Sequence, residues 1–198
     1  ELAAGARAYA DRHGRPETAM TAGNRALPPV DPRGALGHAL SLCVSTCGPD
    51  EFQALSLAHE ILRKPVATDR FALEGKARLN VISENAGAAA DSLCFCPWFR
   101  LAVGGEEMAR ALQAVTGLEC DARRLALCGQ KTIMAEARLA QGEHEQWPLH
   151  SLPPVFFSEP GTPGPGLDIP PLDRSAFERA LQRYISIRIA AVVPECEQ

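Results

Sequence analysis

Two cysteines separated by one residue, Cys94 and Cys96, stand among bulky aromatic side chains, Phe95, Trp98 and Phe99. A thiolate that binds iron or zinc is stabilised by a low-dielectric shell that excludes water, and these aromatic rings can supply one. A proline directly after the second cysteine is typical of iron–sulfur proteins, and it stiffens the backbone beyond the ligand. The alternative is that both cysteines are small buried apolar residues, because one Cys-x-Cys pair cannot complete a metal site.

The composition indicates a weakly acidic globular chain. Its 198 residues include 20 Lys and Arg and 24 Asp and Glu, a net charge of −4, and suffice for one or two domains with a sizeable core. This charge argues against a nucleic-acid or anionic-membrane partner, and no apolar run approaches the roughly 20 residues of a membrane span. Seven cysteines, an odd number, fit a reducing cytoplasm better than a disulfide framework.

Periodicity and capping signals predict an all-α, multihelical fold with irregular, orthogonal helix packing. Asp50 and Asp121 are expected to cap helices, and residues 175–178 are expected to form a capping box. No run of alternating β-branched residues predicts a sheet. The expected helices are 2–13, 35–44, 51–63, 71–90, 106–115, one that follows Asp121 and includes 125–139, and 175–189.

Two proline-rich stretches separate these helices. Residues 16–32 form a connector, because Pro28-Pro29 and Asp31-Pro32 cannot lie inside a helix. Residues 147–172 contain half of the chain's 16 prolines. We therefore expect the second stretch to be a long, irregular strap over a surface. The chain has no initiator methionine or signal-like start, and we expect it to be a piece of a longer polypeptide.

Along nearly its whole length the sequence resembles the C-terminal part of the tungsten-containing aldehyde ferredoxin oxidoreductase family. Residues 25–37 are similar to that family's K-G-x-E-L-P-x-x-D-P-R-x-x-x-G stretch. Residues 91–96 fall on its D-S-L-G-L-C motif, and residues 114–117 match its A-V-T-G turn. The N-terminal helix, the Leu-Pro-Pro at 152–154 and the last helix follow in the same order.

The resemblance implies a redox site. Enzymes of this family hold tungsten between two pterin dithiolenes beside a [4Fe–4S] cluster, oxidise aldehydes to carboxylic acids and pass electrons to ferredoxin. By position, Asp91 is expected to bind a pterin's amino and ring N–H groups, Phe95 to contact the pterin through its backbone, and Cys96 to be the fourth cluster ligand. We expect these three residues at an interior-facing helix end. Without the resemblance, Asp91 is a solvated carboxylate at a helix end.

The resemblance also implies a domain boundary within the chain, and it implies that some cofactor-binding parts lie outside the chain. Residues 1–32 correspond to the end of the middle domain with its connector, and residues 33–198 to the C-terminal helical domain. The family's other cluster cysteines, spaced C-x-x-C-x-x-x-C, and its pterin-binding β domain lie upstream of the matched part. Both cofactors, the cluster and a tungsten or molybdenum bis-pterin, are therefore expected to need the N-terminal part. The expected partners are ferredoxin, an aldehyde and the rest of the polypeptide, with no nucleic acid and no membrane.

Two stretches depart from the family's pattern. The motif has a glycine where this chain has Cys94, so a side chain stands where backbone approaches the cofactor. The family's R-G-x-x-H loop is C-G-P-D-E at residues 47–51, and Gln53 replaces a basic residue. Cys47 and Gln53 cannot supply positive charge to a pterin phosphate.

Glu51 takes the position of the family's histidine near the reacting carbonyl. If burial raises its pKa, Glu51 can act as the catalytic proton acceptor. The alternative is a first-turn glutamate favoured by the helix dipole. We expect Cys47 and Glu51 to approach the same cavity as Cys96, although more than 40 residues separate them in the sequence.

Two other hypotheses remain open. In one, the chain keeps the family's fold but is a degenerate, non-catalytic homologue, because the altered loop has lost its positive charges. In the other, it is a small helical zinc-binding or scaffold module. Four thiolates suffice for a structural zinc site, and the candidates are Cys43, Cys47, Cys94 and Cys96.

Overall fold

The structure is a computed structural model, which describes residues 2–22, 25–141 and 147–190. The α-helices are α1 (Ala6–Arg12), α2 (Leu36–Val44), α3 (Lys76–Ser92), α4 (Gly105–Thr116), α5 (Ala122–Gln141), α6 (Val155–Ser158) and α7 (Arg174–Ala190). Four 3-10 turns are η1 (Leu2–Ala4), η2 (Pro16–Thr18), η3 (Pro32–Gly34) and η5 (Pro97–Leu101), and η4 (Ala58–Leu62) is a π-helix. Within the described ranges the strands are the antiparallel pair β1 (Thr21–Ala22) and β2 (Arg25–Ala26). The mostly helical fold is confirmed.

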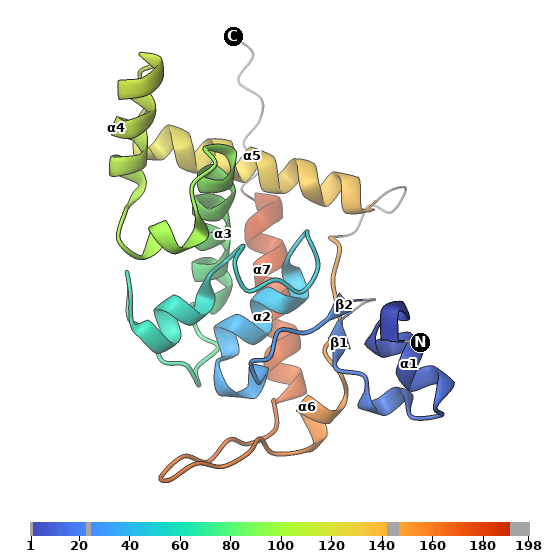
Figure 1. Ribbon diagram of the computed structural model, residues 1–198. Coiled ribbons are helices and arrows are strands. Elements are labelled where there is room, and N and C mark those ends of the chain that lie inside the picture. The colour runs from blue at the N-terminus through green and yellow to red at the C-terminus, as the bar shows by residue number, and fades with distance from the viewer. Residues whose placement is uncertain (1, 23–24, 142–146, 191–198) are drawn as a thin grey trace.

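Helix α3 lies at the centre, in contact with α2, α5 and α7 (Figure 1). Helix α5 crosses α3 where both helices have small residues. A Cβ atom added to Gly129 of α5 would lie 1.8 Å from the carbonyl oxygen of Asn85, so the backbones touch there. Ala89 of α3 continues this narrow contact, because its backbone nitrogen would lie 3.1 Å from the same added Cβ atom. None of the helices in the described ranges is long and apolar enough to cross a lipid bilayer.

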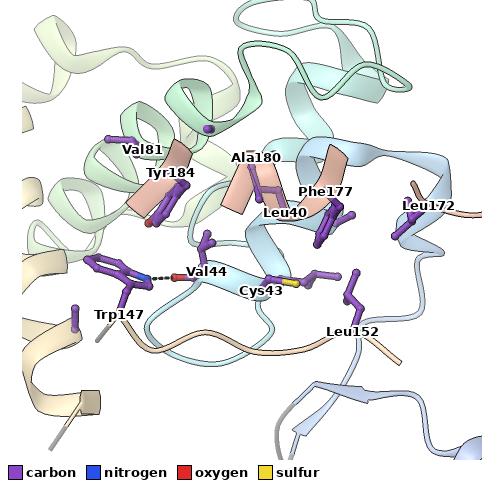
Figure 2. Close-up of a cluster of buried hydrophobic side chains, with 14 of the residues drawn as sticks. Leu40, Cys43, Val44, Val81, Trp147, Leu152, Leu172, Phe177, Ala180 and Tyr184 are labelled. Carbon is purple, nitrogen blue, oxygen red and sulfur yellow. Dashed lines mark hydrogen bonds between the residues drawn. The ribbon is translucent and has the colours of Figure 1, made fainter. Parts of the chain in front are cut away.

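The main hydrophobic core surrounds α2, in which residues 37–44 are all buried. Figure 2 shows Phe177 and Tyr184 of α7 beside Leu40 and Val44 of this helix, in one cluster of buried residues. The indole Nε1 of Trp147 donates a hydrogen bond of 3.0 Å to the carbonyl oxygen of Val44. This bond satisfies one of the carbonyls that a helix leaves unpaired at its C-terminus.

A buried carboxylate caps the other end of α2. Glu60 accepts hydrogen bonds from the backbone N–H groups of Gly37 at 2.8 Å and His38 at 3.0 Å. The same carboxylate lies 2.6 Å from the ammonium group of Lys76, and both side chains are fully buried. A Cβ atom at position 37 would come within 2.9 Å of the Glu60 carboxylate, so a larger residue there would displace the buried pair of Glu60 and Lys76.

A second buried ion pair joins α3 to α7. The guanidinium of Arg188 lies 2.5 Å from the Glu84 carboxylate and donates to the Asn85 side chain at 2.5 Å. The Tyr184 hydroxyl donates to the same carboxylate. Charges removed from water need paired and hydrogen-bonded partners, and here Oε2 of Glu84 accepts both bonds, while its buried Oε1 accepts none.

The proline-rich strap is present, and it runs from Trp147 through α6 to the start of α7 (Figure 1). Arg33 of η3 holds its outer part by donating to the carbonyl oxygens of Glu159 at 2.7 Å and Pro160 at 2.8 Å. Its guanidinium also stands over the Phe156 ring, 5.1 Å from the ring centroid. Asp31 pairs with the same guanidinium at 2.7 Å and fixes its direction.

The helix predicted for residues 51–63 is only partly confirmed, because residues 56–62 are helical, mostly as the π-helix η4, but residues 51–55 are not. Residues 51–54 form turns, and η4 follows with a left-handed residue at Arg63 (φ 59°). Three side chains of the segment contact α3: Ser56 bonds Asn80, His59 lies 3.1 Å from the Ser83 hydroxyl, and Glu60 pairs with Lys76. Matching these buried polar groups to α3 overrides the local preference for a regular α-helix.

At three other helices, a single residue near the end of the helix explains how the structure differs from or agrees with the prediction. The N-terminal helix is divided at Gly5 (φ 90°), and α3 begins only after Gly75 (φ 75°). The last helix is capped by Asp173, which accepts from the Ala176 N–H at 3.0 Å, rather than by the predicted capping box at 175–178. The predicted cap at Asp121 is confirmed by its 2.7 Å bond from the Arg124 N–H. The predicted domain boundary after residue 32 stays a prediction.

Because His38 is completely buried, we expect the free energy of unfolding to fall as the pH is lowered. Burial lowers the pKa of His38 from 6.5 to about 4. The unfolded chain therefore binds this proton more readily, and stability present above pH 6.5 is lost as the pH falls towards 4. The loss from this group is about 3 kcal/mol, at about 1.4 kcal/mol per pKa unit. Burial also lowers the pKa of His59 and His150, which adds in the same direction.

Urea unfolding at a series of pH values measures this effect. His38→Leu should flatten the dependence of the free energy of unfolding between pH 6.5 and 4, without abolishing it. Leu42→Met, in the same buried helix but without a titrating group, should leave the dependence unchanged. An unaltered slope in His38→Leu contradicts the prediction.

Candidate functional site at the end of α3

The motif at residues 91–96 forms the C-terminal cap of α3. The Phe95 N–H donates to the Ala90 carbonyl at 2.9 Å, and the Cys94 N–H donates to the Asp91 carbonyl at 2.9 Å. This pair of bonds is the Schellman motif, in which one residue is left-handed and usually glycine. Here that residue is Cys94, with φ 57°. The glycine of the D-S-L-G-L-C pattern thus has a conformational reason that does not involve a cofactor.

The cap turns Cys96 outward at the start of η5. Cys96, Asp91 and Cys94 are exposed, whereas Phe95 is half-buried and packs against the small core between α3, α4 and α5. The expectation of an interior-facing site is therefore wrong for this chain by itself. The interpretation of both thiols as buried apolar residues is also wrong. The chain exposes a carboxylate in the last turn of α3 and a thiol directly after the cap of this helix.

Arg100, which sequence reasoning missed, joins this helix end to the loop at residues 47–53. Its guanidinium donates to the carbonyl oxygens of Phe52 at 3.0 Å, Gln53 at 3.2 Å and Ser83 at 2.7 Å. The loop backbone is pressed onto α3, because a Cβ atom at Gly87 would lie 2.3 Å from the Gln53 carbonyl oxygen. The sequence offers no periodic signal for such an arginine, since its partners are backbone groups.

Electrostatic and aromatic contacts place the loop beside the motif. Partial burial raises the pKa of Asp91, the Arg100 charge opposes that rise, and the negative charge of Asp50 adds to it. The rings of Phe52 and Trp98 meet edge to face, with centroids 5.4 Å apart. The loop that was expected near Cys96 therefore lies against the same segment of chain, η5 and the end of α3.

Within the loop, Gln53 is buried in a polar network. Its Nε2 donates to the Thr46 hydroxyl at 2.9 Å and to the Glu136 carboxylate at 3.2 Å, and it lies 3.8 Å from the Cys47 sulfur. Partial burial and the Glu136 charge raise the pKa of the Cys47 thiol, so the protonated form is favoured. The network therefore contains an uncharged amide and a carboxylate, whereas the family's pattern has a basic residue at the position of Gln53.

Glu51 is half-buried in this loop, between Asp50 and Phe52. Asp50 accepts a 2.7 Å bond from the Phe52 N–H, which closes a local turn rather than capping a helix. Because residues 51–54 are not helical, the interpretation of Glu51 as a first-turn glutamate is wrong. Its role as proton acceptor stays a prediction.

The zinc hypothesis is contradicted by the positions of the thiols. Cys43 lies in the core, where burial raises its pKa to about 12. Cys94 and Cys96 are on the surface at the end of α3. Across residues 2–22, 25–141 and 147–190, no three His, Cys, Asp or Glu side chains are grouped so that they could hold a metal ion.

Comparison with known proteins identifies the family. The family model described as aldehyde ferredoxin oxidoreductase, domains 2 and 3, matches residues 1–188. The chain belongs to this family. It is 28% identical over 168 residues to the tungsten-containing aldehyde ferredoxin oxidoreductase of Pyrococcus furiosus, and 26% identical over 172 residues to that of Thermococcus kodakarensis. Each match covers 83% of this chain but only 28% of the relative, so the chain spans under a third of these proteins' length.

The left-handed cysteine predicts a stabilising substitution. Cys94→Gly should raise the free energy of unfolding by about 1 kcal/mol, because glycine adopts φ 57° without the strain of a Cβ atom. The same exchange at Cys128, exposed inside α5, should lower it by about 1 kcal/mol. Thermal or urea unfolding of both variants measures the difference, and equal effects at the two positions contradict the Schellman assignment.

Arg100 predicts a coupling between the loop and the motif. Arg100→Gln should lower the free energy of unfolding by about 2–3 kcal/mol, because buried carbonyl oxygens lose a charged donor. Hydrogen exchange should rise in residues 50–54 and 91–101 in particular. Arg110→Gln, which breaks an exposed pair with Glu107, should change stability by less than about 1 kcal/mol. Uniform faster exchange over the whole chain would argue against a local coupling.

Proposed function

We propose that this chain is the C-terminal part of an aldehyde:ferredoxin oxidoreductase and forms one wall of its cofactor site. The observation that supports this most directly is the exposed pair of Asp91 and Cys96 at the end of α3, on the family's motif. An accessible thiol and an accessible carboxylate are the donor groups that an iron–sulfur cluster and a pterin need from a protein. The family match over residues 1–188 supports the same assignment.

In this proposal each motif residue has one role. Cys96 is a thiolate ligand of the [4Fe–4S] cluster, and Asp91 accepts two parallel N–H bonds from a pterin. The backbone of Phe95, held by its bond to Ala90, lies along the pterin. When bound, the tungsten or molybdenum bis-pterin supplies the two-electron oxidation of the aldehyde and the cluster passes the electrons on. Arg100 holds the loop and helix end in register and is a positioning residue.

Glu51 is the proposed proton acceptor. Oxidation of a hydrated aldehyde to a carboxylic acid releases two electrons and two protons, and a carboxylate near the reacting carbon can take one of these protons. Glu51 lies one residue before Phe52, whose carbonyl is bound by Arg100, so its backbone position is tied to the motif. Its half-buried position in the loop leaves the carboxylate partly accessible to a substrate.

The proposed partners are an aldehyde, ferredoxin and the remaining part of the chain's own polypeptide. The rings of Trp98 and Phe99 are 56% and 52% exposed beside Cys96, and an apolar patch next to a ligand suits contact with further protein. A reducing compartment, the cytoplasm, is proposed because every cysteine in the described part is a free thiol.

A second candidate is a homologue that binds cofactors without catalysing oxidation. The buried Gln53 network favours it, because Thr46 and Glu136 hold an uncharged side chain where the family's pattern has a basic residue. A loop without positive charge binds a pterin phosphate less well. The two candidates differ in their expected activity towards aldehydes.

The test uses the longer polypeptide, in which the cluster- and pterin-binding part precedes this chain, reconstituted anaerobically. Cys96→Ala should lower the iron content and abolish aldehyde oxidation, because a cluster ligand is lost. Asp91→Asn should lower the pterin content and leave the iron content unchanged. Cys128→Ala, on the exposed side of α5, should change neither.

Normal iron in Cys96→Ala would refute the proposed ligand. Full cofactor content without aldehyde oxidation in the unsubstituted protein would favour the non-catalytic homologue. Metal analysis of the 198-residue chain should find neither tungsten nor iron, because one cluster ligand and one carboxylate cannot hold these groups alone.

A further inference from the structure

A half-open cavity far from the proposed redox site lies between residues 73–78, at and just before the start of α3, and α7 from Ala176 to Ile187. Its volume is about 820 Å³. Small-molecule sites in proteins usually measure about 300–1,000 Å³, so the cavity is large enough for a ligand of about a dozen heavy atoms. The two helices that form its walls are fixed against each other by the buried pair of Glu84 and Arg188. The cavity is therefore part of the rigid fold.

The floor of the cavity is apolar and its rim is basic. Leu73, Ile187 and three alanines line the floor. Arg78 of α3 and Arg179 and Arg183 of α7 line the rim. Arg179 and Arg183 are four residues apart, so they lie on one face of α7. This arrangement offers apolar contact to one end of a ligand and guanidinium groups to the other.

These three guanidinium groups have no ion-pair partner among the described residues. Each ion pair of the described part joins other side chains. The lining includes one carboxylate, Glu74, and the charge of Arg179 also acts on Asp173 just before α7, so three positive charges stand against two negative charges. Like charges held together on an apolar surface favour an anion, and guanidinium groups bind carboxylates through paired hydrogen bonds.

The position of the cavity argues against the electron acceptor as its occupant. Arg78 and Asp91 are 13 residues apart on the same helix, which corresponds to about 20 Å along α3. An acceptor protein docked over the cavity is therefore remote from Cys96 at the far end of the helix. A small molecule has no such requirement.

We propose that this cavity binds a small organic anion with an apolar body and a terminal carboxylate. The apolar body lies on the floor formed by Leu73 and Ile187, and the carboxylate accepts hydrogen bonds from Arg179 and Arg183. Arg78 adds positive charge from the opposite wall. The inference goes beyond the proposed function and does not depend on it, because no residue of the redox site lines the cavity.

Isothermal titration calorimetry with decanoate, below its micelle-forming concentration, tests the proposal on the 198-residue chain and on the longer polypeptide. Decanoate should bind with one site per chain, and decanol should bind at least about tenfold more weakly, as expected for one charge-assisted contact. Arg179→Gln combined with Arg183→Gln should weaken decanoate about tenfold or more. Arg123→Gln, an exposed arginine on α5, should leave the affinity unchanged.

Several outcomes would overturn the proposal. One is that decanoate and decanol bind with equal affinity. Another is that the double variant binds decanoate as tightly as the unsubstituted chain. A third is that Arg123→Gln weakens decanoate binding as much as the double variant does. Sedimentation analysis without ligand serves as a further control, and self-association that the double variant abolishes would show that the surface binds a second copy. Binding to the 198-residue chain but not to the longer polypeptide would show that further protein fills the cavity.

Discussion

The structure depends on the burial of polar side chains along α3. Lys76, Asn80, Ser83 and Glu84 face the interior with at most 5% of their surface exposed. A buried charge or amide needs a partner, and these partners come from two other parts of the chain, residues 56–60 and α7. Glu60 comes from η4 and Arg188 from α7, while Ser56 precedes η4. These contacts fix the π-helix and the last helix relative to α3, at whose C-terminal end Asp91 and Cys96 lie.

Two family motifs acquire a physical explanation from these contacts. In the D-P-R-x-x-x-G stretch, Asp31 orients Arg33, Arg33 holds the strap, and Gly37 leaves room for the Glu60 carboxylate. In the D-S-L-G-L-C motif, the glycine position is the left-handed residue of a helix cap. Gly37 and the left-handed position occupied by Cys94 have structural roles, and the acid and the thiol of the second motif are left for the cofactors in the proposed function.

Local signals predicted those features that have local causes. Helix α2, the turn at Gly117 after α4, the Asp121 cap and the irregular strap follow from periodicity, glycine, a capping carboxylate and proline. Segment 51–63 was not predictable, because its π-helix results from pairing with side chains 16 or more residues away. The exposure of Asp91 agrees with the alternative of a solvated carboxylate at a helix end, whereas the exposure of Cys96 and the role of Arg100 depend on tertiary packing, which no short pattern encodes.

The fold gives the chain's two tryptophans opposite surroundings. Trp147 is 9% exposed, bonded to the Val44 carbonyl and edge-on to Tyr184, whereas Trp98 is 56% exposed beside Cys96. Intrinsic fluorescence therefore contains two independent reporters. In a Trp98→Phe variant only Trp147 emits, and its emission follows the cooperative unfolding of the core. In a Trp147→Phe variant only Trp98 emits, and its quenching and spectral shifts report on the end of α3. Assembly at that helix end can thus be followed optically without a label and separately from unfolding.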